Sequence, residues 1–213
     1  MAENRSNKSK IVKSENIAPS GLDAIAAAAR QATPEKQPGE RKFPPVHLWN
    51  PPHCGDIGLR IACDGTWFYQ NSPIGRMPLV KLFASVLRKD ADEHVLVTPV
   101  EKISVAVEDA PFLAVEMQIV EKHGRQVLAF RTNVDDWIEA GPGHEIRFEA
   151  GPASGIKPYV RVRADLWALV TRSLFYDLVE IGHTQQDERG EDQFGVTSAG
   201  VFFPMAPAGD LDD

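Results

Sequence analysis

Apolar and polar residues alternate in several short segments of this chain, and the two-residue period predicts half-buried β-strands. The clearest segment follows Cys54-Gly55, where Ile57, Leu59 and Ile61 share one face. Asp64-Gly65 comes next, and an Asp-Gly pair accepts the positive φ angles of a tight hairpin turn. The chain should therefore return as a second strand over residues 66–69.

The next segment changes to the 3.6-residue period of an α-helix. We expect a helix from Met77, with Pro78 in the first turn, where the missing N–H of proline has no helical partner to lose. Its apolar stripe consists of Leu79, Leu82, Phe83, Val86 and Leu87. A short strand over residues 95–98 follows the charged segment 88–93.

From residue 103 onward the pattern is that of successive strands, separated by turns and by the Gly/Pro-rich loops 141–143 and 151–158. A last helix is expected after Asp165 and should stop at Gly182. Its apolar stripe consists of Leu166, Trp167, Val170, Leu174, Leu178 and Ile181. The sequence thus predicts an α+β fold of two small β-rich parts packed together, the second a β-meander closed by a C-terminal helix.

Composition divides the chain into four segments. Residues 1–42 form a flexible N-terminal arm, 43–102 a first α+β domain, 103–182 a second domain, and 183–213 an acidic tail. The arm contains a short Ala-rich helix, too short to be stable alone in water. The apolar face of that helix holds Leu22, Ile25, Ala26 and Ala29. We expect this helix to dock on the globular part or to fray. Both ends should be dispensable for folding, although Val201-Phe202-Phe203 could dock on the core.

Charge and cysteine content narrow the function classes. A formal charge of −7 and a pI near 5.4 argue against nucleic acid as the main partner. No apolar run approaches the roughly 20 residues needed to cross a bilayer, and lysines interrupt the N-terminus where a signal peptide would be apolar. Two cysteines do not make a disulfide framework, so we expect a cytoplasmic protein. The sequence does not fix its oligomeric state.

The loop before the Met77 helix is the best candidate for ligand binding. Gly75 lets the backbone come close to a ligand, and Arg76 stands at the positive end of the helix, so the two could hold an anion. Lys102 would add charge, and Trp49 or Trp67 would stack on a ring. The alternative is that Arg76 pairs with a nearby acidic residue such as Asp64 or Glu101, and that the tryptophans belong to the core. No Walker or GxGxxG motif accompanies the loop.

A second basic segment lies in the expected strand at 159–163. Arg161 and Arg163 alternate with valines and share one face with Tyr159. Such a face could take a phosphorylated ligand or an acidic peptide. We favour the alternative, a solvated face whose arginines pair with Glu145 or Glu149 on a neighbouring strand.

Metal-ligand and nucleophile residue types are present, but their spacing is unfavourable. The candidate ligands His47, His53, Cys54 and Cys63 lack the paired spacing that brings two ligands to one ion, so no metal site is expected. Cys54 beside His53 lacks a third group to orient the base, so no catalytic residue is assigned. We expect no cofactor.

Several short motifs occur together in this order: His47-Leu48-Trp49-Asn50-Pro51, Cys54-Gly55-Asp56, Asp64-Gly65-Thr66-Trp67, Ser72-Pro73-Ile74-Gly75-Arg76, Thr98-Pro99-Val100-Glu101-Lys102 and Pro158-Tyr159-Val160. As a set they resemble the bacterial family known as domain of unknown function 1285 (DUF1285), over roughly residues 43 to 182. The resemblance implies a two-part core related by duplication, whose second part is superficially like a pleckstrin-homology fold. It also implies a cleft between the parts that holds a nucleotide-like ligand, and a signalling role.

These observations favour a non-enzymatic ligand-binding module that senses a nucleotide-like anion in the cleft between its domains. One alternative is a protein-interaction module without a small-molecule ligand. Another is an enzyme of unknown reaction, for which we find no positive signal. A sensor should show a pocket in which cations and an aromatic ring converge, whereas an enzyme should place a base within hydrogen-bond reach of a nucleophile.

Overall fold

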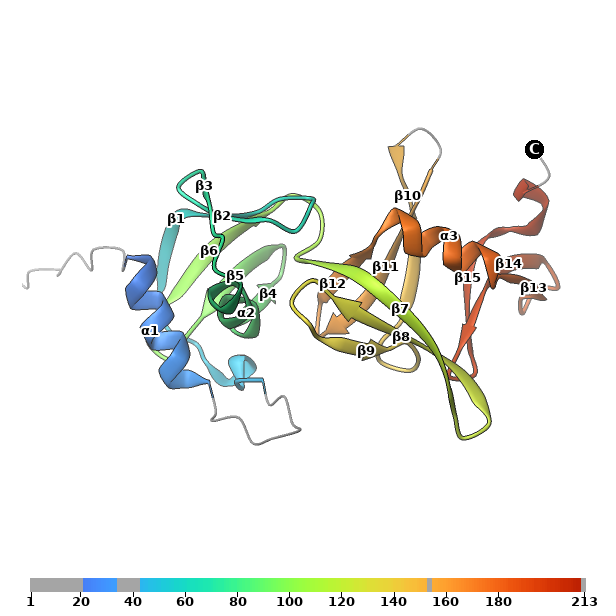
Figure 1. Ribbon diagram of the computed structural model, residues 1–213, viewed down its shortest axis with the longest axis horizontal. Coiled ribbons are helices and arrows are strands. Elements are labelled where there is room, and N and C mark those ends of the chain that lie inside the picture. Colours follow the sequence, from blue (N-terminus) through green and yellow to red (C-terminus); the bar gives the residue numbers. More distant parts are fainter. Residues whose placement is uncertain (1–20, 34–42, 153–154, 212–213) are drawn as a thin grey trace, which may run out of the picture.

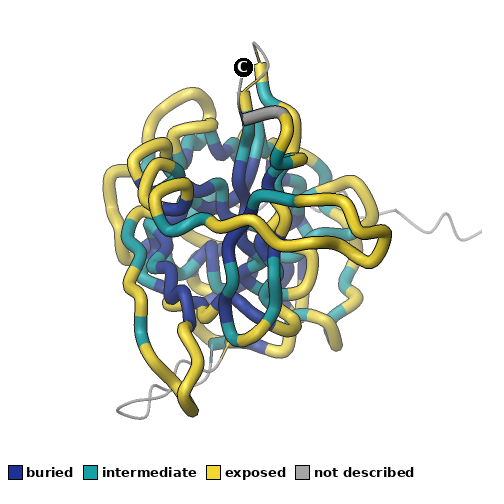
Figure 2. The backbone as a smooth tube through the Cα atoms, turned by 90° about the vertical axis from the view of Figure 1, so that its right-hand side faces the viewer, coloured by how far each residue is buried: buried dark blue, intermediate teal, exposed yellow. Residues whose placement is uncertain are grey.

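Two six-stranded β-sheets form the centres of two lobes that lie side by side (Figure 1). The computed structural model describes residues 21–33, 43–152 and 155–211. Within these ranges the chain is mostly β-sheet with three α-helices, as the predicted α+β class requires. Buried segments gather at the centre of the molecule and exposed turns form its periphery (Figure 2). The rest of the predicted flexible arm, residues 1–20 and 34–42, lies outside the described residues.

The first sheet has the strand order β3-β2-β1-β6-β5-β4. Its strands are β1 (His53–Ile61), β2 (Trp67–Tyr69), β3 (Ser72–Pro73), β4 (Leu87–Asp90), β5 (Glu93–Val97) and β6 (Lys102–Val107). The central pair, β1 and β6, is parallel and the other neighbours are antiparallel. The predicted Asp64-Gly65 turn is confirmed, because Gly65 has φ +77° and the Asp64 carboxylate accepts the N–H of Thr66 at 2.9 Å.

Two helices cover one side of this sheet. Helix α2 (Met77–Ser85) begins where the sequence predicts and buries Leu79 and Phe83, but it ends before Val86 and Leu87, and Leu87 opens strand β4. Helix α1 (Leu22–Ala32) packs against α2. The side chains of its apolar face are part of the core: Ile25 and Ala29 are fully buried and Ala26 nearly so. This burial argues against the expectation that the whole arm is dispensable for folding.

The second sheet repeats the connectivity of the first. Its order is β10-β11-β12-β7-β8-β9, again two runs of three consecutive strands joined by one parallel pair, here β7 and β12. The strands are β7 (Phe112–Lys122), β8 (Arg125–Thr132), β9 (Trp137–Glu139), β10 (Ile146–Ala150), β11 (Ile156–Arg163) and β12 (Leu166–Val170). A shared strand order is the pattern expected of the duplication that the family resemblance implies.

The predicted closing helix is corrected in two ways. Its first half, Leu166–Val170, is strand β12, with alternate side chains buried between β11 and β7. Only Arg172–Glu180 is helical, as α3, and it buries Leu174 and Leu178. The apolar run before Thr171 fits a helix or a buried strand equally well, and its two strand neighbours decide between them.

The predicted acidic tail is also corrected. After α3 the chain forms a three-stranded antiparallel sheet of β13 (His183–Gln186), β14 (Asp192–Ser198) and β15 (Val201–Pro207). Val196, Phe203 and Met205 of this sheet belong to the core. The ring of Phe194 covers Gly182 so closely that a Cβ there would lie 2.2 Å from a ring carbon. Gly182 therefore ends the helix and also makes room for the sheet.

The expected domain boundary after residue 102 falls at the start of β6, which is central to the first sheet. The two sheets instead separate between β6, which ends at Val107, and β7, which begins at Phe112. Parallel pairing of β1 with β6 joins segments some forty residues apart, and no local pattern announces such a pair. No helix in the described ranges is long and apolar enough to span a membrane.

Candidate functional site

The loop before α2 places Arg76 on the surface. Arg76 is the N-cap residue of α2, and its guanidinium lies 4.0 Å from the carboxylate of Asp23 on α1. The two side chains are 69% and 98% exposed, so this contact is weak. Gly75 precedes Arg76 with open space beside its Cα. The anionic neighbour of Arg76 is thus Asp23 and not Asp64 or Glu101, the partners considered from the sequence.

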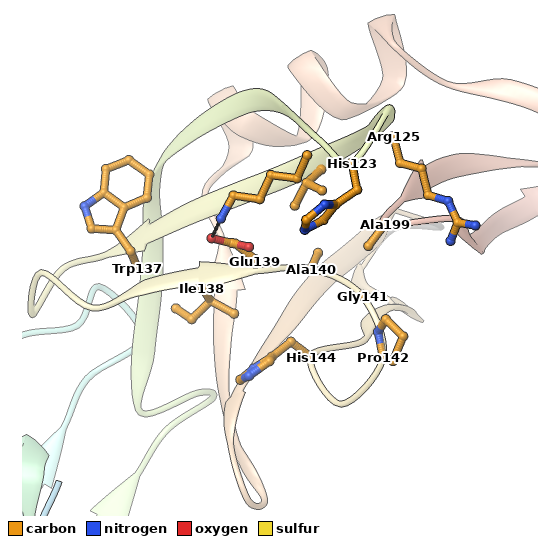
Figure 3. Close-up of a pocket in the computed structure, with 12 residues that line it drawn as sticks. His123, Arg125, Trp137, Ile138, Glu139, Ala140, Gly141, Pro142, His144 and Ala199 are labelled. Carbon is orange, nitrogen blue, oxygen red and sulfur yellow. Dashed lines mark hydrogen bonds and ion pairs between the residues drawn. The ribbon is translucent and has the colours of Figure 1, made fainter. Parts of the chain in front are cut away.

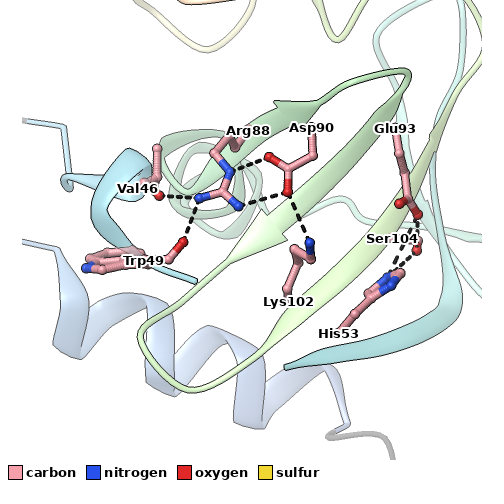
Figure 4. A network of polar contacts seen from close by, with 8 residues as sticks. All are labelled: Val46, Trp49, His53, Arg88, Asp90, Glu93, Lys102 and Ser104. Carbon is pink, nitrogen blue, oxygen red and sulfur yellow. Dashed lines mark hydrogen bonds and ion pairs between the residues drawn. The ribbon is translucent and has the colours of Figure 1, made fainter. Parts of the chain in front are cut away.

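Lys102 is held in a polar network on the outer face of the first sheet (Figure 4). Its Nζ donates to Asp90 at 3.1 Å, and Asp90 also accepts two bonds from Arg88, at 2.6 and 2.8 Å. These bonds, chiefly those from Arg88, hold the pKa of Asp90 below its usual range. Arg88 further donates to the carbonyls of Val46 and Trp49, at 2.5 and 2.7 Å. The network fastens the segment before β1 to edge strand β4.

Trp67 lies away from these cations, whereas Trp49 joins the network of Lys102 through its backbone carbonyl. Trp67 is only 1% exposed and packs against Phe83, with ring centroids 6.2 Å apart. Trp49 is half-buried against the core. Lys102 lies opposite His53 at the first residue of β1, whereas Trp67 lies opposite Ile61 at its last. Of the predicted set of Gly75, Arg76, Lys102, Trp49 and Trp67, Lys102 and Trp67 therefore lie at opposite ends of the nine-residue strand β1.

One histidine-serine contact on the same face resembles a catalytic pair but has the wrong geometry. His53 Nε2 lies 2.8 Å from the hydroxyl of Ser104, and that hydroxyl donates to Glu93. Glu93 also approaches Nε2, at 3.8 Å, whereas the acid of a catalytic triad holds Nδ1. Among the described residues no group of three or more His, Cys, Asp or Glu lies close enough to hold a metal ion.

Charged side chains bridge the two lobes. Arg163 of β11 donates to the carbonyl of Ala84 at the end of α2, and its Nη1 lies 3.5 Å from Asp136. The guanidinium also lies over the rings of Phe43 and Phe112, 4.3 and 5.3 Å from their centroids. Burial lowers the pKa of Arg163 to about 10, and Asp136 opposes that shift. Arg163 is thus a structural link between the lobes.

On strand β11, Arg161 pairs with acidic side chains. Arg161 lies 3.2 Å from Glu145 and 3.3 Å from Asp165, which confirms the expected pairing with Glu145. A bulge in the β11–β12 pairing between residues 161 and 163 separates the environments of the two arginines. Arg161 therefore stays at the surface, 31% exposed, while Arg163 enters the junction at 19%.

A pocket of about 790 Å³ lies on the second lobe, along strand β9 (Figure 3). Trp137 and Glu139 of β9 line it, together with Lys122, His123 and Arg125 from the tip of the β7–β8 hairpin. Trp137 is 48% exposed, in contrast to the buried Trp67. The loop after β9 contributes Gly141, Pro142 and His144, and the β14–β15 turn contributes Ala199. Cations from the hairpin tip line one end of this pocket, and the exposed ring of Trp137 lies at the other (Figure 3).

The cations in this pocket differ in whether a carboxylate neutralises them. Lys122 forms a salt bridge with Glu139, whereas no carboxylate of the described chain lies within salt-bridge distance of Arg125. Arg125 lies against the β14–β15 turn at Gly200. The Nδ1 of His144 lies 3.0 Å from the carbonyl of Arg161, and because a carbonyl only accepts, Nδ1 carries the proton. Among the described residues, no hydrogen-bond or ion-pair partner reaches His123, Arg125 or the Nε2 of His144. These groups are therefore available to a ligand.

A buried serine joins the C-terminal sheet to the pocket. The Ser198 hydroxyl accepts the N–H of Leu128 at 2.8 Å and donates to the carbonyl of Ala140 at 2.7 Å. It thereby bridges the N–H of Leu128 to the carbonyl of Ala140, beside the direct bond from the N–H of Ala140 to the carbonyl of Leu128 at 2.8 Å. The N–H of Ala199 adds a bond to the carbonyl of Gln126 at 2.8 Å. The segment predicted to be a solvated tail is therefore one wall of the pocket.

Replacing Ser198 by alanine should lower the free energy of unfolding by about 1–3 kcal/mol, because it leaves buried backbone groups without a hydrogen-bond partner. Urea denaturation measures the loss. Ser173, an exposed hydroxyl on α3, is the control, and Ser173→Ala should stay within about 0.5 kcal/mol of the original protein. Equal effects of the two substitutions would show that the Ser198 hydroxyl does not hold the two sheets together.

Sequence reasoning missed this pocket because its residues come from three separate segments. The available signal is local: the turn at His123-Gly124 lies between Lys122 and Arg125, so two cations meet at one hairpin tip. Their relation to Trp137 and Ala199 depends on the folding of β9 and β14 against β8, which no spacing in the sequence reveals.

Comparison with known proteins agrees with the fold. The family profile described as "Domain of unknown function (DUF1285), N-terminal domain" matches residues 44–110, and that described as "Protein of unknown function (DUF1285), C-terminal domain" matches residues 111–205. No curated protein matches the chain.

Two solved structures are similar. One is a DUF1285 family protein from Silicibacter pomeroyi DSS-3, 45% identical, with a TM-score of 0.76 over 89% of this chain and 98% of that one. The other is a DUF1285 family protein from Shewanella baltica OS155, 28% identical, with a TM-score of 0.46 over 57% of this chain and 89% of that one. From the profile matches and the first of these structures, the chain belongs to the DUF1285 family.

Proposed function

We propose that this protein is a non-enzymatic module that binds a nucleotide-like anion, and that the anion binds along β9 on the second lobe. The observation that carries the proposal is that one pocket is lined by His123, a half-exposed Trp137 and Arg125, which has no carboxylate partner among the described residues. Its volume of about 790 Å³ is within the usual range for small-ligand sites. The sequence favoured a ligand site in the cleft between the lobes. We place the ligand at β9 instead, because Arg163 and its neighbours occupy the junction between the lobes.

The chemistry of the pocket supports an anion with a flat ring. Arg125 offers a planar guanidinium that binds phosphate through two donors. His123 lies at the same hairpin tip, and Trp137 offers a ring face for stacking at the other end of the pocket (Figure 3). Lys122 is neutralised by Glu139, so the excess positive charge lies at the Arg125 end.

A signalling role and cytoplasmic residence are parts of the same proposal. A non-enzymatic binding module would signal by forming a complex with its ligand, and not by catalysis. Both cysteines are free thiols, which is the form kept in reducing compartments. The pleckstrin-homology-like character of the second part remains a prediction of the family resemblance.

Replacing Arg125 by glutamine should weaken binding of adenosine triphosphate by about 1.5–3 kcal/mol, the contribution of a charged hydrogen bond, with little change in stability. Isothermal titration calorimetry on the full chain measures the affinity. Arg189→Gln, at an exposed arginine outside the pocket, should leave the affinity unchanged. Unchanged binding in Arg125→Gln would contradict the proposal, and Arg76→Lys in the same titration tests the loop before α2 as the anion site.

A protein-interaction module is the second candidate, favoured by exposed apolar side chains on α3 and the neighbouring strand β7. These are Val115, Ile119, Tyr176 and Val179, each between 38% and 55% exposed. Single exposed apolar residues are ordinary, but a group on two packed elements is more typical of an interface. If no nucleotide binds the full chain, that result favours the protein-interaction module.

A further inference from the structure

Strand β9 is an edge strand whose hydrogen-bonding pattern is fixed by its register. It is the last strand of the second sheet, and only β8 pairs with it in the described chain. Thr132 donates its N–H to the carbonyl of Asp136, and Ala140 donates its N–H to the carbonyl of Leu128. In an antiparallel pair such bonded positions alternate with unbonded ones. The backbone groups of residues 136, 138 and 140 therefore face β8.

The intervening residues, Trp137 and Glu139, face the other way. They lie opposite Arg131 and Ala129 as unbonded pairs, so both of their N–H groups and both of their carbonyls point to the open edge of β9. The pocket lies along β9: Glu139 lies on one side of the strand, and Ile138 and His144 lie on the other (Figure 3). A ligand there meets backbone donors and acceptors directly.

Two of these groups form a recognition pair. The carbonyl of Trp137 accepts and the N–H of Glu139 donates, and because the residues are two apart they lie next to each other on the same edge. Adenine carries the complementary pair, an exocyclic amino donor beside a ring nitrogen acceptor. Resting on the function proposed above, we propose that the edge of β9 reads an adenine-like ring: its amino group donates to Trp137 and its ring nitrogen accepts from Glu139.

The spacing to the cations indicates the length of the ligand. Glu139 lies opposite Ala129, and Arg125 is four residues further along β8. At about 3.3 Å per residue this separation is roughly 13 Å along the strand. A ring held at β9 therefore needs a chain of phosphates to reach Arg125 and His123. The ligand class is an adenine nucleotide with more than one phosphate.

The first experiment compares adenosine triphosphate with inosine triphosphate by calorimetry on the full chain. The two have the same phosphates and ring size, but inosine has a carbonyl for the amino group and a ring N–H for the acceptor. We expect inosine triphosphate to bind roughly tenfold or more weakly, because two hydrogen bonds are lost. Equal affinities, both reduced by Arg125→Gln, would overturn this inference and leave the proposed function standing. Binding of neither nucleotide would overturn both.

The second experiment removes the backbone N–H of residue 139, the proposed donor to the adenine ring. Glu139→Pro deletes the outward N–H but no bond to β8, and proline is tolerated at an edge strand with this orientation. Glu139→Ala is the matched control, since it removes the carboxylate and keeps the N–H. We expect the proline variant to bind adenosine triphosphate roughly tenfold more weakly than the alanine variant and to lose its preference over inosine triphosphate. Equal binding in the two variants would overturn the inference. If the proline variant does not fold, the comparison of the two nucleotides decides alone.

Discussion

Replacing Arg163 by methionine is expected to lower the free energy of unfolding by about 3–5 kcal/mol, the range for breaking a buried ion pair from one side. The substitution removes the bond to the Ala84 carbonyl and the cation opposite Asp136, a residue only 7% exposed. It also removes the contact between α2 and the second sheet at this point. Urea denaturation followed by tryptophan fluorescence and by circular dichroism measures the loss.

Arg161 is a matched control for this prediction, because it is an arginine on the same strand with two acidic partners. Its side chain and that of Glu145 are 31% and 44% exposed, so solvent screens the pair. Arg161→Met should therefore cost no more than about 1 kcal/mol. If the two substitutions cost the same, Arg163 does not link the lobes, and the junction depends on its apolar contacts.

Replacing Ile25 by alanine is expected to cost about 2–5 kcal/mol, the range for truncating a buried aliphatic side chain. Ile25 is fully buried between α1 and the rest of the first lobe, and Ala26 and Ala29 beside it leave no large side chain to fill the space. The midpoint of urea unfolding, converted with the measured denaturant slope, gives the change.

Asp23 lies on the opposite side of the same helix and is the control for Ile25. Its side chain is 98% exposed, and its one ion-pair contact among the described residues is that with Arg76 at 4.0 Å. Asp23→Ala should change the free energy of unfolding by less than about 0.5 kcal/mol. A loss that small for Ile25→Ala would show that α1 is not docked in solution and would restore the expectation of a dispensable arm.

Local sequence patterns were sufficient where the structure is local. The Asp64-Gly65 turn needs only an Asx hydrogen bond and one positive φ angle, and both are encoded by those two residues. Helix α2 begins at the predicted position because Pro78 fits the first turn and Leu79 and Phe83 form one face. The apolar face of α1 was also correct. The sequence leaves open whether this helix docks or frays, because a helix of that length is stabilised by what it packs against.

Patterns failed where a segment has two acceptable local structures. Leu166–Val170 is apolar throughout, and its strand geometry follows from pairing with β11 on one side and β7 on the other. Val86 and Leu87 continue the helical spacing of α2, yet Leu87 pairs with Leu96 in the sheet. In both cases long-range backbone pairing overrides a local preference worth only tenths of a kcal/mol per residue.

The sequence by itself determined the class of fold, the positions of the main turns and helices, and membership of a family, because these depend on residue type and short spacing. Only the tertiary structure decided that β6 completes the first sheet, that residues 183–207 form a sheet, and that Arg125, Trp137 and Ala199 meet in one pocket. The physical reason is distance along the chain: parallel strand pairs and a site built from three segments depend on contacts between residues that no local period relates.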